Sequence, residues 1–185
     1  LLQTQGIEAT VLCWSGAKPA SALQQRAREA RYDLLRTACR KRGILHLLVG
    51  HHADDQAETM AMRAARLSGP DGLAGMAPLV EFPEARLLRP LLALPRSRLT
   101  ATLAARHIAW IDDPSNIDLR FERARLRRTG IAGPIVAAGT KAAAERAVHE
   151  GRLAQAAVGV LEFDQEGAAA IDHAGFLALT SDLQR

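Results

Sequence analysis

The amino-acid sequence predicts an α/β fold built on a parallel sheet. Two short apolar runs, 9–14 (ATVLCW) and 44–50 (ILHLLVG), are typical of buried strands. A longer segment with helical spacing follows each run, and strand–helix–strand–helix order is typical of parallel sheets. The 185 residues are 48% hydrophobic, which suffices for a packed core. They contain no apolar run long enough for a transmembrane helix and no secretory signal pattern at the start.

The elements of the first two thirds follow from apolar periodicity and from helix breakers. After Pro19, apolar residues recur at spacings of three and four, and Gly43 predicts the end of this helix. A second helix is expected over 53–67. Further along we predict strands at 77–82 and 86–88 around a Pro83-Glu84 turn, a helix at 95–107, a strand at 109–111 and a basic helix at 117–128.

The last third differs in charge and predicts a second region. Residues 1–133 carry 20 basic and 13 acidic groups, whereas residues 134–185 carry 4 and 7, and the breaker cluster 130–134 (GIAGP) lies at the change. We therefore predict one domain over 1–133 and, over 134–185, a helical linker with the start of a small second domain. This region should contain a helix at 135–157, a hairpin of strands 158–163 and 168–171, and a helix beginning in the final ten residues.

Composition restricts the function classes. Cys13 and Cys39 lie 26 positions apart, which is neither a disulfide framework nor a zinc pattern and fits a reducing cytoplasm. Of the 24 basic residues 21 are arginine. Arginine binds phosphates and stacks on bases, so a nucleic-acid surface is one reading; an ordinary solvated surface is the other.

The stretch 51–59 (HHADDQAET) carries the densest set of chemical groups. It follows the strand 44–50, and ligands of open α/β sheets bind beyond the carboxyl ends of strands. Asp55 and Glu58 are spaced i,i+3 and share a helix face. Two histidines and three carboxylates favour a functional site; a divalent metal site and an acidic helix N-terminus with a capping role are the alternatives.

HHADDQAET resembles the signature of the PP-loop (N-type) ATP pyrophosphatases that modify tRNA. Four more segments occur in the order of that family: AREARY (27–32), GPDGLAGM (69–76), RPLL (89–92) and DPSN (113–116). Over residues 14 to 128 the ordered set resembles the tRNA(Ile)-lysidine synthetase family. The resemblance implies an adenine-nucleotide α-hydrolase-like fold that is incomplete here, ATP and Mg²⁺ as cofactors, tRNA(Ile) and L-lysine as partners, and a possible homodimer.

The implied reaction is the adenylation of the wobble cytidine by ATP, followed by attack of the lysine ε-amine, which releases AMP. Carboxylates that hold the ammonium and accept a proton suit the second step. By resemblance, catalytic roles fall to His51, Asp55, Glu58 and Arg31, and substrate contacts to Arg28, Gly69, Gly72, Gly75 and Arg89. On the basic helix Arg120, Arg123 and Arg127 share a face suited to an RNA backbone, with a solvated helix as the alternative. No metal ligand is assigned.

One departure from the family is large. The phosphate-binding motif Ser-Gly-Gly-x-Asp-Ser does not occur in these 185 residues. We therefore expect the chain to be a fragment without this loop, inactive alone in lysidine formation. The alternatives are a PP-loop tRNA cytidine thiolase, against which the spacing of Cys13 and Cys39 argues, and a noncatalytic RNA-binding module.

Overall fold

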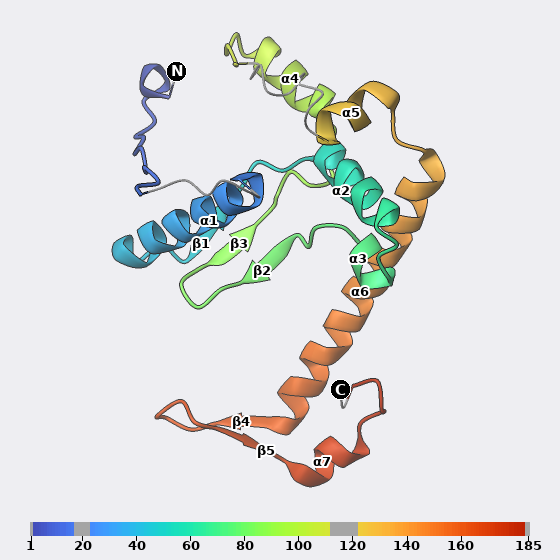
Figure 1. Cartoon of the computed structure of the whole chain (residues 1–185). Helices are drawn as coiled ribbons and strands as arrows, with labels where there is room; N and C mark the ends of the chain where they lie inside the picture. The colour runs from blue at the N-terminus through green and yellow to red at the C-terminus, as the bar shows by residue number, and fades with distance from the viewer. Residues whose placement is uncertain (1, 17–22, 112–121, 184–185) are drawn as a thin grey trace. The chain divides into compact units, whose positions relative to one another are not determined.

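The computed structural model describes residues 2–16, 23–111 and 122–183 (Figure 1). By internal contacts the chain divides into two compact units, Leu1–Thr59 with Met76–Ile131 and Met60–Gly75 with Ala132–Arg185. The division after Ile131 lies close to the predicted one after residue 133, whereas residues 60–75 pack in the second unit. No described helix is both long enough and apolar enough to span a bilayer.

The first unit contains a mixed sheet of three strands, β1 (His46–Leu48), β3 (Arg86–Leu88) and β2 (Leu79–Glu81), in the order β1-β3-β2. β1 and β3 are parallel, as the fold class predicts, with Leu47 opposite Leu87. β2 runs antiparallel to β3, and the Phe82 N–H donates to the Ala85 carbonyl across the Pro83-Glu84 turn. Leu87 is 1% exposed, so the central strand anchors the core of this unit.

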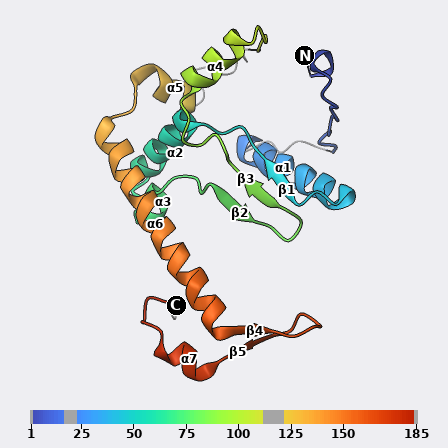
Figure 2. The same ribbon diagram turned by 180° about the vertical axis from the view of Figure 1, so that it is seen from behind.

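Helices of the first unit begin and end close to their predicted limits. α1 (Leu23–Arg42) packs against β1 and ends at Gly43, whose φ of +64° suits a helix C-terminus (Figure 2). α2 (Ala53–Ala65) begins in the first unit and continues into the second. α4 (Arg96–Ala105) has Pro95 at its N-cap. α5 (Glu122–Thr129) overlaps the basic helix predicted at 117–128, of which 117–121 lie outside the described residues. A short 3-10 helix, Gln3–Gln5, lies near the start of the chain.

Two predicted strands of the first unit are wrong. Residues 9–14 form no strand, and Val11 is 85% exposed, because β1 pairs only with β3 among the described residues and leaves this run no partner. Residues 109–111 also lack a partner strand in the described part of the chain, and Ile111 is exposed. Apolar composition thus indicated a run that could form a strand, but it could not indicate whether a neighbouring strand would be present to pair with it.

The second unit is built on the long helix α6 (Gly133–Val160), which is longer at both ends than predicted. The short helix α3 (Pro70–Leu73) packs against α6. The predicted hairpin is confirmed as β4 (Leu161–Phe163) and β5 (Ala169–Ile171), which are antiparallel. The final helix, α7 (His173–Ala178), begins earlier than predicted because Asp172 caps it by accepting from the Ala174 and Gly175 N–H groups, and it ends before the last residues.

Candidate functional site

The site begins where β1 ends and α2 starts. His51 and His52 fill this junction, and the His52 N–H donates to Asp55 Oδ2 at 3.1 Å. This is the return bond of a capping box, so Asp55 has the capping role that the sequence left open. Asp54 accepts from the Arg96 N–H at 3.3 Å and thereby ties the start of α4 to the start of α2. Helix capping therefore fixes the direction of the carboxylates.

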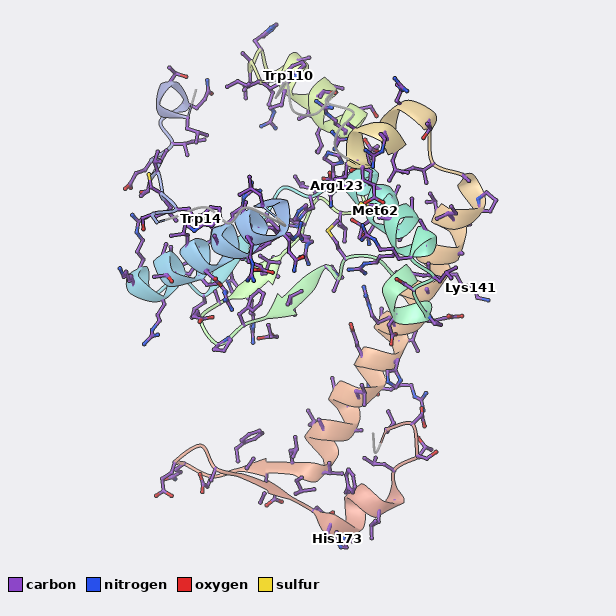
Figure 3. All side chains as sticks on the ribbon, in the orientation of Figure 1. Trp14, Met62, Trp110, Arg123, Lys141 and His173 are labelled. Carbon is purple, nitrogen blue, oxygen red and sulfur yellow. The ribbon has the colours of Figure 1, made fainter. Side chains whose placement is uncertain are left out.

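Two arginines of α5 face two carboxylates of α2. Arg127 donates through Nε to Glu58 Oε1 and lies 3.7 Å from Asp55 Oδ1. Arg123 Nη1 lies 3.7 Å from Asp55 Oδ1 and 3.8 Å from Glu58 Oε2 (Figure 3). Glu58 is 1% exposed, so its charge is buried and is compensated by these guanidinium groups. The hydrogen bond and the ion pair with Glu58 raise the pKa of Arg127 above its ordinary value.

A third arginine contacts His51. Arg89 directly follows β3, is 8% exposed, and donates through Nη1 to the Ala77 carbonyl. Its Nε donates to Nδ1 of His51 at 3.4 Å. Burial, together with the positive charge of Arg89, lowers the pKa of His51 below 6.5. Burial and Arg89 therefore favour the neutral form of the His51 imidazole over the charged form.

A pocket of about 400 Å³ opens beside the carboxylates. It is lined by the starts of α2 and α4 and by the end of α5, among others by His52, Asp54, Glu58, Arg96 and Arg127. Cationic and anionic side chains thus border one open space. Such a space suits a small polar ligand that carries charges of both signs.

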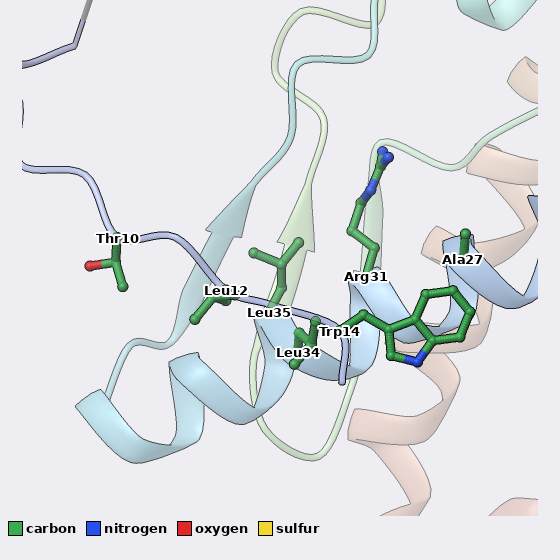
Figure 4. A pocket seen from close by; sticks show the side chains of 7 residues that line it. All are labelled: Thr10, Leu12, Trp14, Ala27, Arg31, Leu34 and Leu35. Carbon is green, nitrogen blue, oxygen red and sulfur yellow. The ribbon is translucent and has the colours of Figure 1, made fainter. Parts of the chain in front are cut away.

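The arginines of α1 are placed differently from each other. Arg28 lies near enough to His51 to contribute to lowering its pKa, and its guanidinium stacks on Tyr32 at 5.3 Å from the ring centroid. Arg31 lines a separate, largely apolar pocket with Trp14, Leu12 and other residues (Figure 4). Arg28 therefore joins the group around His51, and no interaction with that group is described for Arg31.

The three glycines lie in the second unit. Gly69 precedes α3, Gly72 lies within it, and Gly75 has a φ of +70°, which favours glycine. The carbonyls of Gly72 and Gly75 both accept from Nη1 of Arg63. The segment is thus held from inside its own unit, and a substrate contact by these glycines stays a prediction.

The remaining predicted positions are Arg120, the DPSN segment and the two cysteines. Arg120 and the DPSN segment lie outside the described residues. Cys13 is exposed, Cys39 is buried, and both are free.

Sequence reasoning missed two residues that shape the site. Gln56 clamps the backbone of Met76, accepting from its N–H at 2.7 Å and donating to its carbonyl at 3.0 Å. The Gln within HHADDQAET was the available signal. Arg96 lines the pocket through the start of α4, and nothing in its local sequence marked it.

Comparisons with known proteins agree with this architecture. A family model described as "PP-loop domain" matches residues 2–132. A tRNA(Ile)-lysidine synthase of Rhodopseudomonas palustris is 52% identical over 116 residues, which cover 63% of this chain and 34% of the relative. One of Methylobacterium nodulans is 47% identical over 123 residues, covering 66% and 36%. One of Methylobacterium sp. (strain 4-46) is 41% identical over 194 residues, covering 96% and 56%.

The chain therefore spans between about a third and just over half of the length of these curated relatives. The family match, in contrast, covers well over half of the chain itself. On that match, this chain belongs to the PP-loop domain family.

Proposed function

We propose that this chain is the amine-handling part of a tRNA(Ile)-lysidine synthase. In the proposed reaction ATP transfers AMP to the C2 oxygen of the wobble cytidine and releases pyrophosphate. The lysine ε-amine then attacks C2, the C–O bond breaks, and AMP leaves. The curated relatives of this chain carry that name. The observation that carries the proposal is the joint position of His51, Arg89 and the Asp55–Glu58 pair at one end of the parallel strands.

In this proposal the carboxylates bind the amine of lysine and accept its proton. Asp55 and Glu58 already bind two cationic side chains, so their geometry suits an ammonium group. As the amine attacks it must lose protons, and a carboxylate within hydrogen-bond reach accepts one. For lysine to reach Glu58, Arg127 has to turn toward solvent or toward a phosphate. Its side chain is 33% exposed, which leaves space for this movement.

In this proposal the arginines near His51 stabilise the negative charge of the leaving phosphate group. Arg89 and Arg28 both act on His51 electrostatically, and no carboxylate contact with Arg89 is found among the described residues. A surplus of positive charge in a partly buried place stabilises the charge that develops on a leaving phosphate. We propose Arg31 as an additional catalytic group and Gly69, Gly72 and Gly75 as a substrate-side turn. Arg120, Arg123 and Arg127 would contact RNA when Arg123 and Arg127 leave the carboxylates.

ATP and Mg²⁺ enter the proposal together. No group of three or more His, Cys, Asp or Glu side chains suited to a metal occurs among the described residues. Asp55 and Glu58 are engaged by arginines, so these side chains do not fit a metal held by the protein alone. Mg²⁺ usually keeps several waters and binds substrate phosphates. We propose that it arrives with ATP and that the chain's own residues act on the nucleotide and the amine.

Two features of the protein's setting stay predictions. We place it in the cytoplasm, where its tRNA substrate would be. A homodimer is proposed only by resemblance. The thiolase alternative is not favoured, because Cys13 and Cys39 are separated in sequence and differ in burial.

The test is lysine transfer by the product of the complete gene. We expect ATP-dependent incorporation of labelled lysine into a tRNA(Ile) transcript. Asp55→Asn and Glu58→Gln should each lower the rate by about 10²–10⁴-fold, the usual contribution of a general base. Glu145→Gln, which removes an exposed carboxylate of α6, is the control and should retain the rate. Absence of lysine transfer by the unaltered gene product, or incorporation of sulfur instead, would contradict the proposal.

A further inference from the structure

The parallel strands bring His51 and Arg89 together from distant parts of the sequence. His51 follows β1 by three residues, and Arg89 is the first residue after β3. The Val49 N–H donates to the Leu88 carbonyl at 3.0 Å, so the ladder between the strands extends up to the site. The relative position of the two side chains is therefore set by the sheet rather than by a loop.

The backbone holds Arg89 on two sides. Its N–H donates to the Pro78 carbonyl at 2.8 Å, and Nη1 donates to the Ala77 carbonyl. With 8% exposure, the guanidinium has little freedom to turn away. Its Nε points at the imidazole of His51.

The chemistry of this contact determines where His51 carries its proton. Every guanidinium nitrogen is a donor, so Nδ1 of His51 must be the acceptor. A neutral imidazole has one protonated nitrogen, which leaves the proton on Nε2. No described residue bonds Nε2. We propose that Arg89 is a positioning residue that fixes His51 as the neutral tautomer protonated on Nε2, so that His51 offers a hydrogen-bond donor to a substrate oxyanion.

Charged side chains around His51 both raise and lower its pKa. Arg89 after β3, Arg28 on α1 and Arg123 on α5 disfavour a second proton on the imidazole. Asp55 on α2 has the opposite sign and favours that proton, but it acts less strongly than burial and Arg89. The pKa of His51 is lowered as a result.

The tautomer divides the roles at the site. Because Nδ1 is occupied and Nε2 carries the proton, His51 has no free lone pair and cannot accept a proton from the lysine amine. It can donate to a phosphoryl oxygen or to a developing oxyanion. The deprotonation of the amine then falls to Asp55 or Glu58. This division of roles rests on the proposed function, whereas the tautomer is a property of the chain itself.

Nitrogen NMR of the histidine rings tests the inference directly. The probe is the ¹⁵N-labelled chain, observed between pH 5 and 8.5, with His51→Gln to assign the His51 signals among the six histidines. We expect an unprotonated Nδ1, a protonated Nε2 and a pKa below 6.5. A protonated Nδ1 in the unaltered chain overturns the proposal without any variant.

Two substitutions separate charge from hydrogen bonding. Arg89→Lys keeps the positive charge and loses the Nε donor, so the tautomers should mix while the pKa stays lowered. Arg28→Met removes a charge without touching Nδ1, so the pKa should rise while the tautomer stays fixed. A fixed tautomer in folded Arg89→Lys would overturn the proposal, and backbone amide spectra establish that each variant is folded.

The NMR test of the His51 tautomer does not depend on whether the proposed lysine transfer is correct. If the lysine-transfer assay fails, the ring nitrogen signals still decide the tautomer. If the tautomer is wrong, lysine transfer can still occur with a different division of roles.

Discussion

Glu58 is 1% exposed, and its partner Arg127 comes from a helix 69 residues further along the chain. Glu58→Gln keeps the volume of the side chain but removes the negative charge that compensates Arg127. Because Arg127 is partly exposed, water relieves some of the cost, and we expect a loss of about 1–3 kcal/mol in the free energy of unfolding.

Urea unfolding at pH 7 measures this loss, and Glu145→Gln is the matched control. Glu145 pairs with Lys141 on the exposed surface of α6, so its substitution should change stability by less than about 0.5 kcal/mol. If Glu58→Gln and Glu145→Gln lowered the free energy of unfolding equally, the buried Glu58–Arg127 pair would contribute no more to stability than an exposed ion pair.

The lowered pKa of His51 predicts a pH dependence of stability. In the unfolded chain His51 takes up a proton near pH 6.5, whereas in the folded chain it does so only at lower pH. The unfolded state therefore binds more protons as the pH falls below 6.5, and this group favours unfolding there. We expect the unaltered chain to lose more stability than His51→Gln between pH 7.5 and 5, as measured by urea unfolding. Parallel curves would contradict the prediction.

The sequence predicted where the candidate residues lie in the fold better than it predicted which side chains they contact. HHADDQAET was correctly placed at a strand end, because a short apolar run followed by polar groups marks that position. Arg123 and Arg127 were correctly placed on one helix face, since spacing alone determines a face. What that face meets depends on tertiary packing, so the ion pairs with Asp55 and Glu58 were not predictable from spacing.

At the scale of elements, Gly139 sets how closely α6 approaches its neighbours in the second unit. A Cβ at this position would lie within 3 Å of the Met60 side chain and of the Leu73 carbonyl. Gly139→Ala should therefore lower stability by about 1–3 kcal/mol through overpacking. Gly159 lies on the same helix, and a Cβ there would meet nothing within 4 Å, so Gly159→Ala should raise stability by about 0.5–1 kcal/mol.

Thermal or urea unfolding of the two alanine variants measures whether Gly139→Ala lowers the free energy of unfolding while Gly159→Ala raises it. The same substitution in the same helix differs only in its surroundings, which makes each variant the control for the other. A gain of stability in both variants would show that α6 is not closely packed at Gly139.

Elements whose partners lie nearby in sequence were predicted well. The strand 86–88 and the turn at Pro83-Glu84 match the structure, because a hairpin carries both strands and its turn in one short segment. The strand at 9–14 was wrong, because strand formation there requires a neighbour that local sequence cannot specify. The helix limits were close wherever a glycine or proline marked them, as at Gly43 and Pro95.

At the scale of the whole molecule, the 185 residues lack the Ser-Gly-Gly-x-Asp-Ser motif. A glycine-rich loop surrounds phosphates with backbone N–H groups, and a set of arginine side chains does not replace that geometry. We expect this chain alone to transfer no lysine to tRNA(Ile) in the presence of ATP. The product of the complete gene, assayed under the same conditions, is the positive control, and measurable transfer by the chain alone would refute the expectation.

Residues 9–13 are exposed and Trp14 is half-buried, which has a consequence for handling the protein. Its six residues, ATVLCW, include β-branched and aromatic side chains and no charge, and Val11 is 85% exposed. Segments of this kind pair with copies of themselves and can nucleate cross-β aggregates. Concentrated solutions should therefore develop thioflavin fluorescence over time, and Val11→Lys should suppress it, since a single charge interrupts the stacking of identical strands.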